Sequence, residues 1–155
     1  LVEETTANLF CVISTGIEQI RGLHKNPIEE LYEIKKFVLV HLKNEKSSPQ
    51  HQLQKYYPKI YDKMHSGQFE LMEECIEENL QRGIDQGVYR ENIQIDFISR
   101  IYFSGVTSIK NQKLFPMHKF PVASLMDEYL EYPFRGIVTP KGRKILNTII
   151  NSNHE

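Results

Sequence analysis

Apolar residues recur at three- and four-residue steps along almost the whole chain, whereas alternation of apolar and polar residues is nearly absent. The three- to four-residue step puts apolar side chains on one face of a helix. The sequence therefore predicts an all-α fold, a bundle of several helices without a sheet. A chain of 155 residues without an internal repeat suits one helical domain spanning residues 1–155.

Capping residues and prolines predict where the helices begin and end. A first helix ends near Gly22, and Asn26 with Pro27 begins a second one that runs to about Lys43. Pro133 is expected to kink or stop the helix that contains it, because proline removes a backbone donor. Further helices are expected over residues 49–57, 58–86, 95–111 and 122–132, and from Pro140, capped by Thr139, to the end of the chain.

The stretch "IDQGVYREN", residues 84–92, separates two of the longest helical patterns. Gly87 is expected to end the first of them in a left-handed conformation, which costs glycine little. Val88 and Tyr89 then supply apolar contacts behind the turn. Arg90 has two readings, as a partner of a helix-end carbonyl or acid and as a solvent-facing side chain.

The amino-acid composition excludes several classes of protein. A hydrophobic share of 40%, a charged share of 25% and a formal net charge of -1 are typical of a globular protein and provide no basic face for nucleic acid. No run approaches the roughly 18 apolar residues of a membrane span, so a cytoplasmic protein is expected. Leu1 falls inside a helical pattern, and we expect a piece of a longer chain.

Residue spacing gives little support to metal binding or catalysis. The two cysteines form no CxxC pair, and the six histidines lack the spacing that places two ligands on one helix face. Neither GxSxG, GxxxxGK[ST], HExxH nor GxGxxG occurs, so no enzyme, metal or cofactor is expected. The acidic run "EECIEENLQR" indicates a solvated helix face, with Glu78 and Arg82 as an ion pair.

Aromatic and methionine side chains gather in "KYYPKIYDKM" and continue along the same predicted helix. Such residues usually form core, and they also suit the wall of a cavity between helices. His41 has the same ambiguity, as a pocket residue or as a core or surface histidine. The candidate ligand-binding residues are Phe10, Phe37, His41, Tyr57, Tyr61, Met64, Phe69, Met72 and Tyr102.

The segments 95–111 and 122–134 carry more apolar surface than one buried face of each helix needs. Contact with a second copy would cover the excess, and small residues would allow the helices to approach closely. Packing inside one subunit is the alternative. The candidate interface residues are Phe97, Ile101, Ser104, Gly105, Ser108, Ile109, Leu125, Tyr129 and Tyr132.

Three motifs in series then carry a resemblance: "KYYPKIYDKM", "NLQRGIDQGVYRENIQIDFISRIY" and "EYPFRGIVTPKGRKIL". In these residues, roughly 53–150, the chain resembles the ligand-binding and dimerisation region of the tetracycline-repressor (TetR) family of bacterial transcriptional regulators. The opening "LVEETTANLF" looks like the helix that follows the DNA-binding headpiece in that family. The resemblance implies a homodimer that senses a small apolar or amphipathic effector and binds operator DNA through a helix-turn-helix upstream of this chain.

Two other function classes remain open at this point. One is a monomeric helical carrier for an apolar metabolite, and the other is a structural adaptor with a solid core. The effector, the operator and the sign of regulation do not follow from the residues.

Overall fold

The computed structural model describes residues 2–43, 49–109 and 111–153, and these fold into helices. The all-α prediction is confirmed, and no strand forms within these ranges. Tyr89 and Val138 make one isolated antiparallel bridge. The helices are α1 (Val2–Gly22), α2 (Pro27–Lys43), α3 (Pro49–Tyr56), α4 (Pro58–Asp85), α5 (Ile95–Ser108), α6 (Val122–Ile137) and α7 (Pro140–Ser152).

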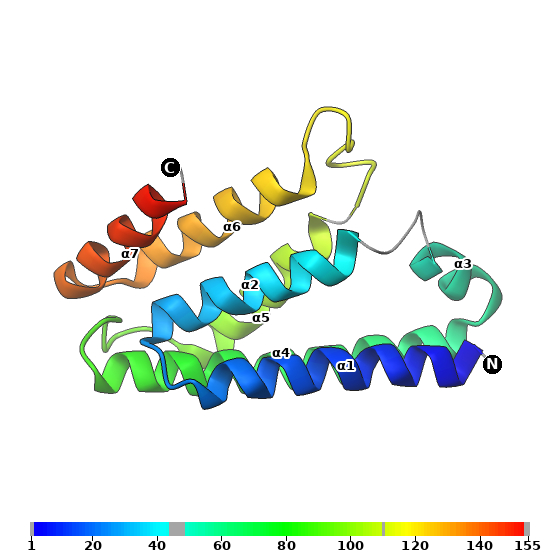
Figure 1. Cartoon of the computed structure of the whole chain (residues 1–155), viewed down its shortest axis with the longest axis horizontal. Helices are drawn as coiled ribbons and strands as arrows, with labels where there is room; N and C mark the ends of the chain where they lie inside the picture. The colour runs from blue at the N-terminus through cyan, green and yellow to red at the C-terminus, as the bar shows by residue number, and fades with distance from the viewer. Residues whose placement is uncertain (1, 44–48, 110, 154–155) are drawn as a thin grey trace.

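The long helix α4 is the central element of the bundle, because α1, α2, α3 and α5 all pack against it. Figure 1 shows α1 and α4 running along the length of the molecule, with α2 above them and α6 and α7 farther out. Helix α6 contacts α2 and α5, and α7 contacts α2. Helix α5 therefore lies between α4 and α6.

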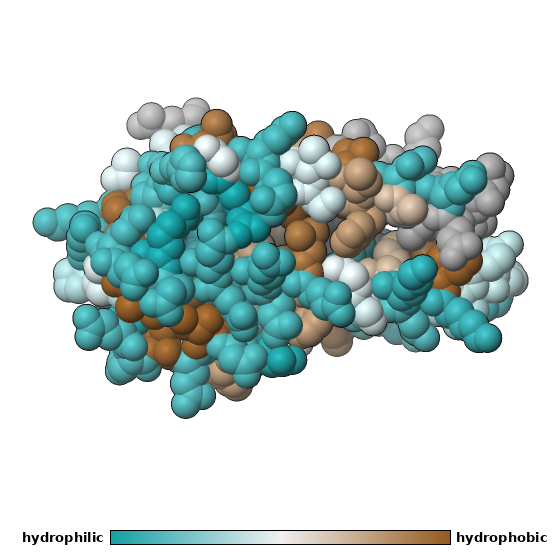
Figure 2. Space-filling view, turned by 90° about the horizontal axis from the view of Figure 1, so that it is seen from below, coloured by the Kyte–Doolittle hydropathy of each residue, from teal (hydrophilic) through white to brown (hydrophobic). Residues whose placement is uncertain are grey.

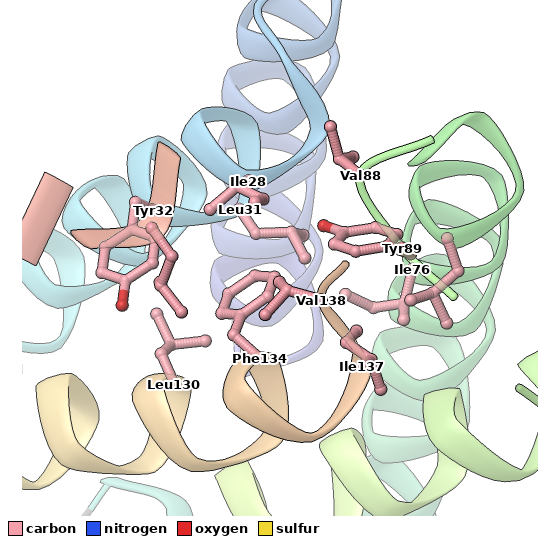
Figure 3. Close-up of a cluster of buried hydrophobic side chains, with 12 residues drawn as sticks. Ile28, Leu31, Tyr32, Ile76, Val88, Tyr89, Leu130, Phe134, Ile137 and Val138 are labelled. Atoms are coloured by element: carbon pink, nitrogen blue, oxygen red, sulfur yellow. The ribbon is translucent and has the colours of Figure 1, made fainter. Parts of the chain in front are cut away.

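The main core lies where α2, α4, α6 and α7 meet the turn that follows α4. Figure 3 shows the Tyr89 and Phe134 rings pointing into this space, with aliphatic side chains from α2 and α4 around them. Tyr32 stacks on Phe134 at a ring separation of 5.7 Å. The buried members are Ile28, Leu31, Tyr32, Ile76, Leu80, Val88, Tyr89, Leu130, Phe134, Ile137, Val138 and Leu146.

The predicted caps are present. The Asn26 side chain accepts a hydrogen bond from the Glu29 amide at 2.9 Å, and the Thr139 hydroxyl accepts one from the Gly142 amide at 3.2 Å. Gly87 has a φ of 73°, in the left-handed region. Helices α3, α4 and α5 end one to three residues earlier than predicted, at Tyr56, Asp85 and Ser108.

Of the two alternatives for Pro133, a kink or a stop, the stop is wrong, because α6 continues through Pro133 to Ile137. Leu130, Phe134 and Ile137 lie buried on one face of α6, on both sides of the proline. Burial of these side chains outweighs the loss of one backbone hydrogen bond. Tertiary packing therefore overrides the local preference.

Candidate functional site

The outer side of α5 is an uncovered helix face. Phe97 and Ile101 are 57% and 50% exposed, and Ser104 and Ser108 are exposed beyond them. These positions follow one another at steps of four, three and four residues, so their side chains share one side of the helix. We call Phe97, Ile101, Ser104 and Ser108 the α5 stripe.

Exposed apolar side chains as large as Phe97 and Ile101 indicate an interaction surface only when they are grouped. On α6, Tyr132 is 80% exposed, and it follows by three residues Tyr129, which packs on α5. Figure 2 shows hydrophobic residues gathered in more than one place on an otherwise mostly hydrophilic face. Five predicted interface residues, the α5 stripe and Tyr132, are exposed in the isolated chain.

The other four predicted interface residues pack inside the chain. The Tyr129 ring lies over Gly105, where an added Cβ would come within 2.1 Å of it. Its hydroxyl donates to the carbonyl oxygens of Ile101 and Tyr102, at 3.0 and 2.9 Å, and burial raises its pKa to about 12. Ile109 and Leu125 are buried together with Met126 in a second apolar cluster. These four residues therefore have packing partners within the chain.

The nine predicted ligand-binding residues do not gather around one cavity among the described side chains. Tyr102 and Met72 pack against the main core, Met64 is half-buried, and Tyr57 is 48% exposed. His41 belongs to α2, but its side chain lies outside the described residues. The plain-core reading therefore accounts for Tyr102 and Met72.

Tyr61 and Phe69 belong instead to an aromatic seam between α4 and α5. Tyr61 stacks on His65 at 5.9 Å, and His65 and Phe69 both meet the edge or face of Phe103, at 5.4 and 5.0 Å. Sequence reasoning missed His65 and Phe103. The four-residue spacing of Tyr61, His65 and Phe69 was the available signal for the α4 half.

A shallow groove of about 320 Å³ runs over α1 and α2. Phe37 of the predicted ligand-binding set lies in its wall, and an added Cβ on Gly16 would come within 2.0 Å of that ring. Phe10 precedes the groove residue Cys11 along α1 and approaches Gly67 of α4. The groove is lined by Cys11, Val12, Thr15, Gly16, Gln19 and Phe37.

A second, partly open cavity between α2, α4, α5 and α6 measures only about 20 Å³ and is lined by apolar side chains and Tyr102. A cavity of that size holds about one water molecule, whereas sites for small-molecule ligands measure roughly 300–1,000 Å³. The groove, rather than this cavity, has the volume that a small ligand needs.

Three carboxylates converge beside the start of α5. Ligand atoms of Glu73, Glu77 and Asp96 all lie within 4.8 Å of one another. The Arg100 guanidinium donates to Asp96 at 2.9 Å and lies 3.0 Å from Glu73, so it offsets part of this charge. The prediction of a wholly solvated acidic face is therefore too simple, since Glu73 and Glu77 are half-buried.

The predicted pair of Glu78 with Arg82 is wrong. Arg82 pairs with Glu30 of α2 at 2.5 Å, and Glu78 pairs with Arg21 of α1. Both observed partners come from other helices, because the packing of α1 and α2 on α4 brings them nearer than the local neighbour. Sequence spacing could not reveal these pairs.

A buried polar network joins α2, α4 and the turn after α4. The Asn79 amide donates to the Pro27 carbonyl at 2.8 Å and to the Glu30 carboxylate at 3.1 Å, and Tyr89 donates its hydroxyl to Asn79 at 3.0 Å. Burial, and then the nearby Glu30 charge, raise the pKa of Tyr89 well above its ordinary value. Burial therefore favours the neutral form of Tyr89, and the hydrogen bonds of the network fix the corner of the core.

No protein-family model, curated protein or solved structure matches this chain. No helix in the described ranges combines the length and the apolar character that crossing a membrane requires.

Proposed function

We propose that this chain is the regulatory region of a TetR-like transcriptional regulator, a non-enzymatic homodimerising domain that responds to a small apolar or amphipathic effector. Operator DNA is bound in this proposal by a helix-turn-helix headpiece outside the chain. The observation that carries the proposal is the α5 stripe, which leaves Phe97 and Ile101 at least half exposed. Exposed apolar residues grouped on a helix are typical of protein interfaces.

The arrangement around the stripe supports a subunit contact at this helix. Tyr129 of α6 donates hydrogen bonds to two carbonyl oxygens of α5. These bonds hold α5 in place on the side that faces the protein interior. A rigid face binds a partner with little loss of conformational entropy. Tyr132 adds a third large exposed side chain from the neighbouring helix α6.

The groove over α1 and α2 is the proposed effector site. Its volume of about 320 Å³ lies at the lower end of the range for small-molecule sites. Val12, 50% exposed, and Phe37 supply apolar contacts, and Thr15 and Gln19 supply polar groups that would orient a guest. A guest that wedges α1 from α2 would move α1, the helix that leads toward the proposed headpiece.

A monomeric carrier is less well supported, since a carrier encloses its cargo. The cavity of about 20 Å³ between α2, α4, α5 and α6 is too small for a metabolite.

The test is the paired substitution Phe97→Glu with Ile101→Glu, followed by sedimentation equilibrium. Carboxylates at both positions of the α5 stripe would lose their hydration in a subunit contact, so we expect the dimer to dissociate at least tenfold more readily. Circular dichroism should show unchanged helix content, because both positions are exposed.

The control is Val12→Glu, which places one carboxylate on an apolar position of α1 that is as exposed as Ile101. This variant should remain a dimer. If Val12→Glu dissociates the protein and the α5 variant does not, the subunit contact lies over α1 and the proposed interface is wrong.

A further inference from the structure

The side chains of the α5 stripe are large in the N-terminal half of the helix and small in its C-terminal half. Phe97 and Ile101 occupy its first half, and Ser104 and Ser108 occupy its second half. The arrangement is symmetric in position about a point between Tyr102 and Phe103. Position 97 lies as far before that point as position 108 lies after it, and the same holds for positions 101 and 104.

We propose that a second copy of this chain packs on the stripe with its α5 antiparallel, related by a two-fold axis through that midpoint. This inference rests on the homodimer proposed above and adds the orientation and register of the two subunits. Phe97 then lies against Ser108 of the partner subunit, and Ile101 lies against Ser104 of the partner subunit. Both contacts occur twice, as a two-fold interface requires.

Packing density favours this orientation. Helices in contact lie about 8–10 Å apart, and a large side chain fits at that distance when a small one faces it. A parallel pair would put Phe97 against its own copy and Ser108 against its own copy. The helices would then be held apart at one end and leave a void at the other, where the side chains lining the void would lack van der Waals partners.

Charge favours the antiparallel orientation as well. The N-terminal end of α5 lies beside the carboxylates of Glu73, Glu77 and Asp96. The positive charge of Arg100 offsets only part of their negative charge. The sequence from residue 97 to residue 126 contains no aspartate or glutamate. Lys113 and Lys119 are exposed and follow the C-terminal end of α5 in the chain. Antiparallel pairing brings the acidic end of one copy to the basic end of the other, whereas parallel pairing brings like charges together.

Cysteine cross-linking of two neighbouring serines tests the register. Ser104→Cys and Ser108→Cys are made separately in a Cys11→Ser background, since Cys11 is exposed and Cys75 is buried. Both variants keep Phe97 and Ile101. With a rise of about 1.5 Å per residue, the two copies of position 104 lie about 4.5 Å apart along an antiparallel pair, and the two copies of position 108 about 16 Å apart.

We expect a short bis-maleimide to cross-link Ser104→Cys to a covalent dimer and to leave Ser108→Cys at the level of the Cys11→Ser background. A mixture of Phe97→Cys and Ser108→Cys chains with different affinity tags should give cross-linked dimers that carry both tags. Cross-linking of both serine variants with themselves would show a parallel pair and overturn the proposal.

Sedimentation equilibrium of the same variants separates failure of the register from failure of the dimer. A dimer in which neither serine position cross-links has its contact elsewhere, which overturns the antiparallel α5 pair and leaves homodimerisation standing. A monomer at all concentrations overturns both.

Discussion

Two glycines let the turn after α4 and the start of α7 approach each other. Gly87 needs its backbone freedom, because its φ of 73° lies where other residues are strained. Gly142 needs its small volume, since an added Cβ would lie 2.1 Å from the Val88 carbonyl oxygen. With both turns close, Thr139 donates its hydroxyl to the Gly87 carbonyl at 2.7 Å, and Arg90 donates its amide to the Ile137 carbonyl at 2.8 Å.

Gly87→Ala tests the backbone requirement without a steric one, because an added Cβ meets nothing within 4 Å. We expect the free energy of unfolding to fall by about 1 kcal/mol, the cost of the left-handed conformation for alanine. Urea unfolding measures the change.

The control is Gly136→Ala in α6, where the Cβ also meets nothing and φ is not positive. Alanine favours the helix there, so stability should stay the same or rise by up to about 1 kcal/mol. Equal losses at the two positions would contradict the conformational explanation.

Helices α2 and α4 are joined by the polar network around Asn79 rather than by apolar contact alone. The Asn79 side chain is almost fully buried. It hydrogen-bonds to the Pro27 carbonyl, the Glu30 carboxylate and the Tyr89 hydroxyl. Glu30 also binds Arg82. One side chain therefore connects the start of α2, the last turns of α4 and the turn that follows.

Asn79→Ala should destabilise the protein by about 2 kcal/mol or more, because it leaves buried polar groups without partners and opens a small void. Gln81→Ala is the control two positions further on, where the exposed side chain hydrogen-bonds to Asp85. That loss should stay below about 0.5 kcal/mol. Similar urea midpoints for the two variants would show that the network contributes little.

The sequence predicts the helices well and their partners poorly. Periodicity and caps such as Asn26 and Thr139 depend on residues that are close in sequence, so the starts of the helices can be predicted from the sequence. The packing of Tyr129 on Gly105 joins positions 24 apart, and the Arg82 pair with Glu30 joins positions 52 apart. Such long-range contacts decide which apolar face of a helix becomes buried. Because of them, some predicted interface residues are exposed and others pack inside the chain.

At the scale of the whole molecule, buried neutral acids link stability to pH. Burial raises the pKa of Cys75 to about 11 and that of Tyr32 to about 12, and it also raises the pKa of Tyr102. In an unfolded chain, cysteine and tyrosine titrate at about 9 to 10. Above that pH the unfolded state releases protons that the folded state keeps, so folding becomes less favourable.

We therefore expect a stability that is unaffected by these groups below about pH 9 and that falls as pH rises through 10 and 11. Urea unfolding at intervals between pH 8 and pH 11 measures this slope. Tyr102→Phe removes one of the responsible groups and keeps its ring, so its slope should be shallower than that of the wild type. A stability that rises over this range would contradict the assignment.

We expect this chain to form a homodimer, and sedimentation equilibrium of the unmodified protein across micromolar concentrations tests this expectation. One chain has a mass of 18.2 kDa. We predict a species of twice that mass that dissociates to the single chain on dilution. A mass of 18.2 kDa at every concentration would contradict this expectation, because Phe97, Ile101 and Tyr132 would then be exposed without a second copy to cover them.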